Sequence, residues 1–205
     1  MKIEVPFYRQ EARNDCAPTA LKMVLDFLGS SKYSKEELLN LVDSDKSGVT
    51  WTIALAKTAA QLGFRTEFYS SMLGFNPQNY QLDFYKKEAD TANSVQQKLE
   101  KLKGEAVKFK VHLEEKRLQL KDILDKINPD CVAIVLLDWS KIKGTKEGFI
   151  GHTVPIVGYD EENVYVHNQG DINPGEFIPI KKELFDIARK SPGTDEDIVF
   201  VHRKI

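Results

Sequence analysis

The chain is most tightly constrained by a cysteine that stands at the start of an apolar helix. After Cys16, apolar residues recur at helical spacing as far as Leu28, and Gly29 follows as a stop. Asp15 is a natural N-cap, and Pro18 fits a first turn because its missing N–H costs nothing there. Unpaired backbone N–H groups and the positive end of the helix dipole favour a thiolate over a thiol at this position. The sequence therefore predicts a buried helix whose first turn lowers the pKa of the cysteine.

A second constrained unit lies far downstream and is typical of a β-hairpin. The segment 151–170 contains two apolar runs joined by a polar turn at residues 160–163. Folding this segment back on itself brings His152 opposite Asn168 or Asp171, depending on the length of the turn. The hairpin therefore predicts an imidazole beside an amide or a carboxylate, and it leaves the choice between the two open.

Together, the two units supply the residue types of a thiol hydrolase. Such an enzyme needs a cysteine nucleophile, a histidine base and a third group that orients the histidine. Gln10 lies shortly before Cys16, and its amide NH2 is a donor of the kind that stabilises an oxyanion. An early cysteine followed much later by histidine and asparagine is also the chain order of papain-like enzymes. We therefore interpret Cys16 as the nucleophile, His152 as the general base and Gln10 as an oxyanion donor.

Several short motifs of this chain occur in an order that resembles one peptidase family. They are Val-Pro-Phe-Tyr-Arg-Gln at 5–10, Asp-Cys-Ala-Pro-Thr-Ala at 15–20, Leu-Gly at 28–29, Gly-His at 151–152, Val-Gly-Tyr at 157–159 and Val-Tyr-Val at 164–166. They resemble the C39-like branch of papain-fold cysteine peptidases, over most of the chain apart from residues 71–105. The resemblance implies an α+β papain-like fold, with N-terminal helices packed on a mostly antiparallel β-sheet. It also implies the roles already given to Gln10, Cys16 and His152.

Two positions depart from the pattern of that family. Ala17 follows the nucleophile where the family usually has glycine, a mild change that a helical position accepts. Asn168 and Gln169 occupy the positions of a usual aspartate and proline. An asparagine can orient the histidine through its carbonyl oxygen, but it adds no negative charge that would favour an imidazolium. We predict that Asn168 orients His152, with Asp171 as the alternative.

The rest of the chain predicts one domain over residues 1–205, in an α+β order of helices first and strands afterwards. A capping box at Ser34–Glu37 begins a second helix, and alternation at 107–111 predicts a strand. Residues 71–105 are interpreted as a helical surface insertion, because the apolar stripe of its second helix is narrow.

Composition excludes several classes of protein. The 205 residues carry a formal net charge of -2, which gives no electrostatic reason to bind nucleic acid or an anionic membrane. The N-terminus has no apolar signal core and no apolar run reaches about 18 residues, so we expect a cytoplasmic protein without a membrane partner. Cys131 opens an apolar run and is expected in the core rather than in a disulfide. We expect no metal and no cofactor, and the oligomeric state stays open.

The leading hypothesis is a stand-alone cysteine hydrolase that cleaves a peptide or amide bond through an acyl-enzyme on Cys16. Trp139, beside the loop that enters His152, and Trp51, near a helix start, are the predicted substrate contacts. One alternative is an acyltransferase that passes the same thioester to an amine or a thiol. The other is a catalytically silent module that keeps the fold and binds peptides.

Overall fold

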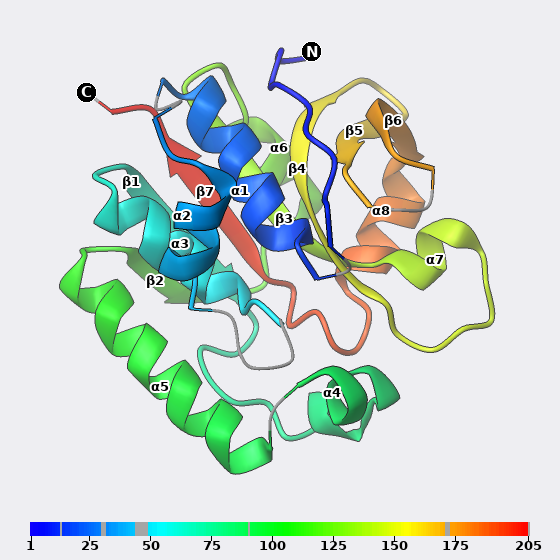
Figure 1. Ribbon diagram of the computed structural model, residues 1–205. Helices are drawn as coiled ribbons and strands as arrows, with labels where there is room; N and C mark the ends of the chain where they lie inside the picture. The colour runs from blue at the N-terminus through cyan, green and yellow to red at the C-terminus, as the bar shows by residue number, and fades with distance from the viewer. Residues whose placement is uncertain (13, 30–31, 44–48, 90, 171–172, 205) are drawn as a thin grey trace.

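The computed structural model describes residues 1–12, 14–29, 32–43, 49–89, 91–170 and 173–204. Within these residues the strands form one seven-stranded sheet in the order β2-β1-β7-β3-β4-β5-β6 (Figure 1). The strands are β1 (Arg65–Ser70), β2 (His112–Glu115), β3 (Cys131–Asp138), β4 (Gly151–Tyr159), β5 (Asn163–Asn168), β6 (Gly175–Lys181) and β7 (Ile198–His202). Paired strands are antiparallel except β1 and β2, which are parallel. The predicted α+β fold with a mostly antiparallel sheet is confirmed.

The first three helices precede the first strand, as the sequence predicts. The helices are α1 (Cys16–Phe27), α2 (Lys35–Leu41), α3 (Thr52–Gln61), α4 (Asp83–Glu88), α5 (Ala92–Lys108), α6 (Leu120–Lys126), α7 (Trp139–Lys143) and α8 (Lys182–Arg189), with a 3-10 turn η1 (Asn79–Gln81). Helix α1 packs against β4 and β3, and α3 packs against β1 and β7, so both cover the face of the sheet turned to the viewer in Figure 1. The predicted capping box is present at the start of α2.

The predicted apolar stripe of α1 is buried. Leu21, Val24 and Leu25 have no exposed surface, and they belong to the same hydrophobic cluster as the central strands β3 and β7. Full burial of one such side chain is worth about 1.5–3 kcal/mol. Helix α1 is therefore fixed on the sheet, and its first turn, which carries Cys16, is fixed with it.

The strand predicted at residues 107–111 is wrong, because α5 continues into this segment. Val107, which a strand would use as a core position, is 61% exposed, whereas Leu102 at helical spacing is fully buried. The helix is followed by Lys110 at a positive φ of 62°, and β2 begins only after this turn. A short alternating pattern is outweighed here by the longer helical stripe, which buries more apolar surface.

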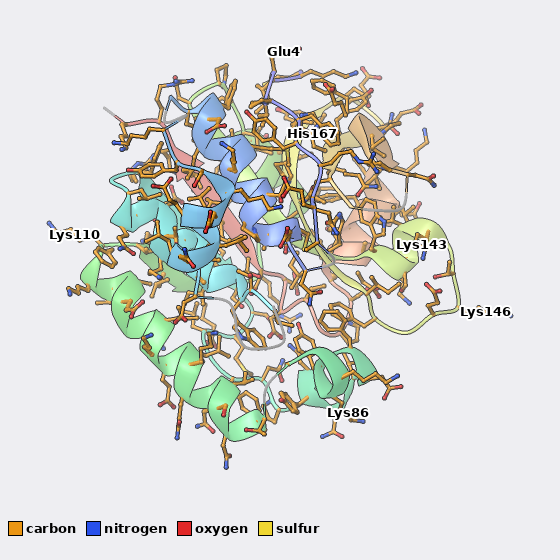
Figure 2. All side chains as sticks on the ribbon, in the orientation of Figure 1. Glu4, Lys86, Lys110, Lys143, Lys146 and His167 are labelled. Carbon is orange, nitrogen blue, oxygen red and sulfur yellow. The ribbon has the colours of Figure 1, made fainter. Side chains whose placement is uncertain are left out.

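Most of the segment 71–105 is helical, since it contains η1, α4 and the greater part of α5. The narrow stripe of Val95, Leu99 and Leu102 is buried where α5 packs against α3, so this helix contributes to the core. Helices α4 and α5 lie at the lower edge of the molecule in Figure 1, and Lys86 projects outward from α4 in Figure 2.

The N-terminal residues lie along β4 and lead toward the start of α1. Ile3 donates its N–H to the carbonyl of Val157, and Tyr159 donates its N–H to the carbonyl of Met1. Between these two hydrogen bonds, Gly158 adopts a φ of +155°. The crossing brings two backbones so close that a side chain at position 158 has no room.

His167 fastens this N-terminal segment to the sheet (Figure 2). The ring is fully buried; its Nε2 bonds to the carbonyl of Val5 at 2.8 Å, and its Nδ1 accepts the N–H of Phe177 at 3.1 Å. Burial lowers the pKa of His167, which keeps the ring neutral and able to make both bonds. Because neighbours on a strand point to opposite faces, His167 is turned away from the face that Asn168 occupies.

Replacing Gly158 with alanine is expected to destabilise the fold by more than about 1 kcal/mol. A Cβ at this position would lie 2.4 Å from the carbonyl oxygen of Met1 and 2.8 Å from Cα of Lys2. Urea unfolding of the purified variant measures the loss. Gly104→Ala is the control, because that helical position has open space and should gain stability; equal stability changes for the two variants would contradict this account.

Candidate active site

A cavity of about 1070 Å³ opens beside the N-terminus of α1. The structure brings all six side chains that the sequence predicts for the site to its wall: Gln10, Cys16, Trp51, Trp139, His152 and Asn168. They come from the N-terminal segment, the starts of three helices and two neighbouring strands, so only the folded sheet assembles them. Their chemical roles stay predictions.

Cys16 is the first residue of α1 and Asp15 is its N-cap, as predicted, but the Asp15 side chain does not cap the helix. Instead, its carboxylate accepts the N–H of Ala12 at 3.0 Å and pairs with Lys35 at 2.6 Å. The carboxylate thereby closes the turn that delivers the chain into α1. The N–H groups of the first helical turn are left for other acceptors.

The pKa of the Cys16 thiol is raised, and the predicted lowering is wrong. Burial is the largest cause and raises the pKa, because a thiolate loses its hydration inside the protein. Hydrogen bonds from the backbone and side chain of Thr153, and from the N–H groups of Ala17 and Cys16, act in the opposite direction. The helix start therefore contributes as predicted but is outweighed. Ionisation of this thiol at neutral pH needs a base beside it.

His152 and Asn168 lie side by side, as the hairpin predicts. Nε2 of His152 is 3.0 Å from Oδ1 of Asn168, which also accepts the N–H of Gly170 at 3.1 Å. The other end of the amide donates to the carbonyl of Asn173 at 2.8 Å, so these contacts assign which end of the amide faces the ring. Nε2 of a neutral His152 then carries the proton, and Nδ1 is the nitrogen with basic character. Asp171, the alternative orienter, lies outside the described residues.

Trp139 packs edge-on against the imidazole, with ring centroids 4.8 Å apart and an interplanar angle of 70°. It begins α7, whose N-cap is Asp138: the carboxylate of Asp138 accepts the N–H of Ser140 at 3.1 Å and that of Ile150 at 3.2 Å. These two bonds tie α7 to the loop that enters β4. Trp139 is only 8% exposed, so most of its surface packs inside the protein and little of it faces the cavity.

The segment 71–105 supplies an aromatic wall that the sequence analysis does not predict. Tyr85 of α4 is stacked between Trp51 and Phe149, at 5.7 Å and interplanar angles of 13° and 15°. Its hydroxyl donates to the carbonyl of Gly193 at 2.6 Å. Trp51 therefore forms part of a three-ring stack, and α4 is held against the cavity by both packing and a hydrogen bond.

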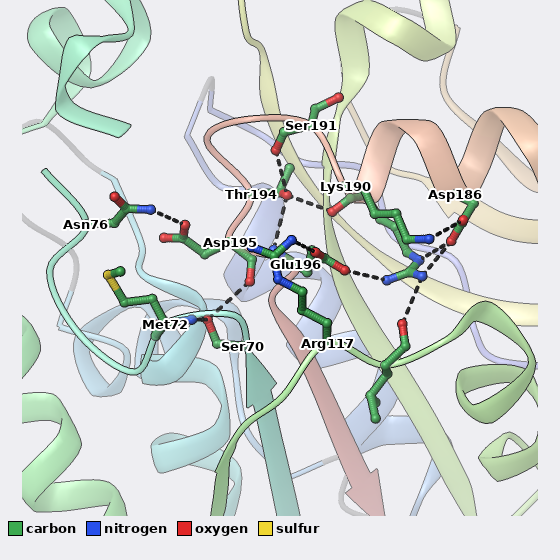
Figure 3. Close-up of polar contacts among 12 residues, drawn as sticks. Ser70, Met72, Asn76, Arg117, Asp186, Lys190, Ser191, Thr194, Asp195 and Glu196 are labelled. Carbon is green, nitrogen blue, oxygen red and sulfur yellow. Dashed lines mark hydrogen bonds and ion pairs between the residues drawn. The ribbon is translucent and has the colours of Figure 1, made fainter. Parts of the chain in front are cut away.

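The loop 191–197 lines the same cavity and anchors the segment 71–105 (Figure 3). The Asp195 carboxylate accepts from the side-chain amides of Asn76 at 2.6 Å and Asn79 at 2.7 Å. Asp195 and Glu196 both have positive φ, at 47° and 54°, a conformation that non-glycine residues rarely adopt. Strain of this kind persists only where surrounding contacts hold the backbone in place.

Glu196 provides those contacts through two arginines. Arg189, which has no exposed surface, donates to the Glu196 carboxylate at 3.2 Å and to the carbonyl of Leu118 at 2.9 Å, and it pairs with Asp186 at 2.5 Å. Arg117 reaches the same Glu196 carboxylate at 2.8 Å from the exposed side. The network links α8, the loop and the segment before α6, and so holds the strained loop in place.

Asp197 lies at the base of the same loop, and burial raises the pKa of its carboxyl to about 8, with the charge of Asp195 as a second cause. Its folded-state pKa is above the unfolded value, so the folded protein binds this proton more tightly. The resulting stability is complete at acid pH and is lost as pH rises through about 8. Asp197→Asn should therefore make the protein more stable at pH 8, by ~2 kcal/mol.

Urea unfolding at pH 5 and pH 8 measures this effect. The asparagine variant should lose less stability between the two pH values than the wild-type protein, whereas Asp83→Asn, at an exposed position of the same cavity, should not differ from wild type. A wild-type stability that is flat between the two pH values would contradict the assignment.

Two further observations concern metals and membranes. Among the described residues, no group of three His, Cys, Asp or Glu side chains is placed to hold a metal ion. The helices in that part of the chain are all too short or too polar to cross a membrane.

A comparison with known families decides the membership of this chain. The family described as guanylylate cyclase matches residues 5–201. This chain belongs to that family. Its relative Guanylyl cyclase 1 from Arabidopsis thaliana is 23% identical over 214 residues, which cover 98% of this chain and 76% of the plant protein.

Solved structures that resemble this member of the family are peptidase domains and proteins described as peptidases. The peptidase domain of Streptococcus ComA, a bifunctional ABC transporter, has a TM-score of 0.54 at 15% identity and covers 98% of this chain and 99% of its own. A double-glycine-motif protease from an AMS/PCAT transporter, solved with a leader peptide, has a TM-score of 0.52 at 14% identity and coverages of 98% and 94%. A Bacillus anthracis protein described as C39-like has a TM-score of 0.55 at 12% identity and coverages of 100% and 98%.

These likenesses confirm the papain-like fold that the sequence motifs imply. At such low identity they carry the fold alone. The matching family is the guanylylate cyclase family rather than the C39-like peptidases, so the resemblance read from the motifs is correct for the fold and does not extend to family membership.

Proposed function

We propose that this protein is a cysteine hydrolase that cleaves a peptide or amide bond through an acyl-enzyme on Cys16. The observation that carries the proposal is the hydrogen-bonded pair of His152 and Asn168 on the wall of the cavity that Cys16 also lines. A nucleophile, a base and a group that orients the base are the minimum for this chemistry. The raised pKa of the thiol makes the base necessary, because burial alone leaves Cys16 protonated at neutral pH.

The chemical steps follow from the assigned protons. Nδ1 of His152 takes the thiol proton, and the Cys16 sulfur attacks the carbonyl carbon of the substrate. The oxyanion that forms is stabilised by the N–H of Cys16 and the side-chain amide of Gln10. The imidazolium then protonates the departing amine, which leaves an acyl-thioester. Water, deprotonated by the same nitrogen, hydrolyses the thioester and restores the thiol.

The cavity wall supplies the substrate contacts of this proposal. Trp139 and Trp51 both line the cavity. The substrate class is therefore a peptide or amide with an apolar group that fits the aromatic wall.

Active-site labelling tests the proposal directly. Iodoacetamide at mildly acidic pH should label Cys16 of the wild-type protein, because only a thiol paired with a base is ionised there. Product analysis with and without added amine separates the hydrolase from the acyltransferase, which would make an amide in place of an acid. A thiol that reacts only at alkaline pH would favour the catalytically silent peptide-binding module.

A second candidate is cyclisation of GTP, favoured by the description of the family and the name of the plant relative. The cavity offers aromatic rings for a base, together with the lysines Lys87, Lys103 and Lys143 as partners for phosphates. Cyclic GMP formation by the purified protein tests it. The Cys16→Ala variant distinguishes the candidates, since it should abolish amide hydrolysis and leave a cyclase unaffected.

Replacing Asn168 tests the orienting role within the hydrolase. Asn168→Asp adds a negative charge beside the imidazolium, so the upper limb of the pH profile for Cys16 alkylation should move to higher pH. Asn168→Ala removes the oriented acceptor and should lower the rate about tenfold or more with less movement of that limb. If both variants match the wild type while Asp171→Asn does not, the orienting residue is Asp171.

A further inference from the structure

Gln169 follows β5 directly and fills the space between α1 and β4. The side chain has no exposed surface. Its Nε2 donates to two carbonyl oxygens, that of Cys16 at 2.8 Å and that of Thr153 at 2.5 Å. The backbone carbonyl of Gln169 accepts the N–H of Gln10 at 3.0 Å. One residue thus touches the backbone of the nucleophile, of the oxyanion donor and of the residue next to His152.

The orientation of the Gln169 amide follows from its partners. Two carbonyl oxygens require the NH2 end of the amide, so Oε1 points elsewhere, and this buried oxygen has no hydrogen-bond partner among the described residues. An unsatisfied buried acceptor costs about 1–3 kcal/mol, whereas two neutral hydrogen bonds contribute about 1 kcal/mol each. The two contributions are of similar size, so net stability does not account for a glutamine here. Its effect is on geometry.

Near the site, β-sheet hydrogen bonds hold β4 on only one of its two edges. The β4–β5 ladder reaches Ile156 and Val166 and goes no further toward the site. Beyond that pair, His152 and Thr153 are held by the β3 ladder on one edge. On the other edge, the Gln169 side chain takes the place of a ladder bond by binding the carbonyl of Thr153, and it joins that carbonyl to the first turn of α1.

We propose that Gln169 is a positioning residue that fixes the Cys16 backbone relative to Thr153, and so relative to the adjoining His152 ring. The proposal rests on the proposed function only in taking Cys16 as the nucleophile. Thr153 has a second link to the thiol, since its N–H and hydroxyl both hydrogen-bond to the sulfur of Cys16 and act to lower the pKa. A shift of α1 against β4 would lengthen these bonds and would move the thiol relative to the His152 ring, which is carried by the same strand as Thr153.

The test measures the pH profile of Cys16 alkylation in the full chain, with Cys131 replaced by alanine to leave one thiol. Gln169→Met keeps the size of the side chain and removes both donors. Its alkylation rate at pH 7 should fall about tenfold, as the profile moves to higher pH by about one unit. Gln169→Glu should show at least the same shift, because its carboxylate has only acceptors to face the two carbonyl oxygens.

Thr66→Val is the matched control, since Thr66 is a buried donor to a backbone carbonyl, that of Ala56 at 3.3 Å, away from the cavity. This variant should lose a similar small amount of stability in urea unfolding and leave the alkylation profile unchanged. A Gln169→Met protein that is less stable but keeps the wild-type profile would overturn the proposal. Should that variant fail to fold, Gln169→Asn, with an amide one methylene shorter, is judged by the same profile.

The experiment separates failure of this inference from failure of the proposed function. If His152→Ala leaves the alkylation profile of the otherwise unchanged protein as it was, the hydrolase proposal fails. The Gln169 variants are still informative in that case, because their shift also measures the loss of the Thr153 donors, which do not depend on His152.

Discussion

Replacing His152 with alanine is expected to lower the rate of Cys16 alkylation at pH 7 by about a hundredfold. Burial raises the pKa of the thiol above its usual range near 9. Without a base, the cysteine is then protonated almost entirely at pH 7. In the proposed hydrolase the imidazole accepts the proton, and the resulting ion pair would keep a thiolate at neutral and mildly acidic pH.

The measurement is the rate of carbamidomethylation at Cys16, followed by peptide mass spectrometry from pH 5 to pH 10. Cys131 gives an internal reference, because burial raises the pKa of its thiol to about 12 and it should stay unmodified throughout. His112→Ala is the control for loss of a histidine, since that side chain is exposed and far along the sheet at β2. Identical profiles for the wild-type and His152→Ala proteins would rule out His152 as the base.

The pairing of His152 with Asn168, and the position of Cys16 on the same cavity, could be predicted because each part depends on local pattern. Helical spacing after Cys16 places it in a first turn, and a hairpin with a polar turn places His152 against Asn168. The step from two units to one site came from the motif order of a known fold, since spacing alone does not say which face of a sheet a helix covers.

The pKa of Cys16 shows where local reasoning stops. The N-terminus of a helix is visible in the sequence, and its N–H groups act to lower the pKa, but the pKa as a whole is raised. Burial depends on what the rest of the chain places over the thiol, and it is the larger cause. The strand predicted at 107–111 is wrong for the same reason. The apolar stripe of α5 is buried because α5 packs on α3, and this long-range contact is not visible in the local sequence.

The part of the cavity formed by the aromatic stack and the loop 191–197 could not be predicted either, because its contacts join segments that are distant in sequence. Tyr85 gives no local signal that it stacks between Trp51 and Phe149, and Asp195 gives none that it accepts two amides from the segment 71–105. The sequence gives one weak signal for this wall. Asp195 and Glu196 are acidic residues in the turn between α8 and β7, and no helical or strand pattern accounts for them. The same holds for Gln169, which the sequence presents only as a departure from a motif.

Replacing Arg189 with methionine is expected to cost about 3–5 kcal/mol of stability. The guanidinium is fully buried and pairs with Asp186 and Glu196. Its removal leaves the Glu196 carboxylate, which is only 5% exposed, without the buried positive charge that compensates it. The loss should appear as a lower urea midpoint with an unchanged slope. Glu196→Gln in the same protein should recover part of the loss, since it removes the carboxylate left without that partner.

Arg117 provides the comparison that decides whether burial is the cause. It binds the same Glu196 carboxylate, but its side chain is 72% exposed, and Arg117→Met should therefore cost less than about 1 kcal/mol. Comparable losses in both variants would show that charge near Glu196 matters and its burial does not. Loss of Arg189 should also affect the cavity, because Glu196 and Asp195 share a strained turn and Asp195 holds the segment 71–105. Arg189→Met should thus loosen the aromatic wall, whereas the thiol environment at Cys16, held by α1, β4 and Gln169, should keep its alkylation profile as long as the protein is folded.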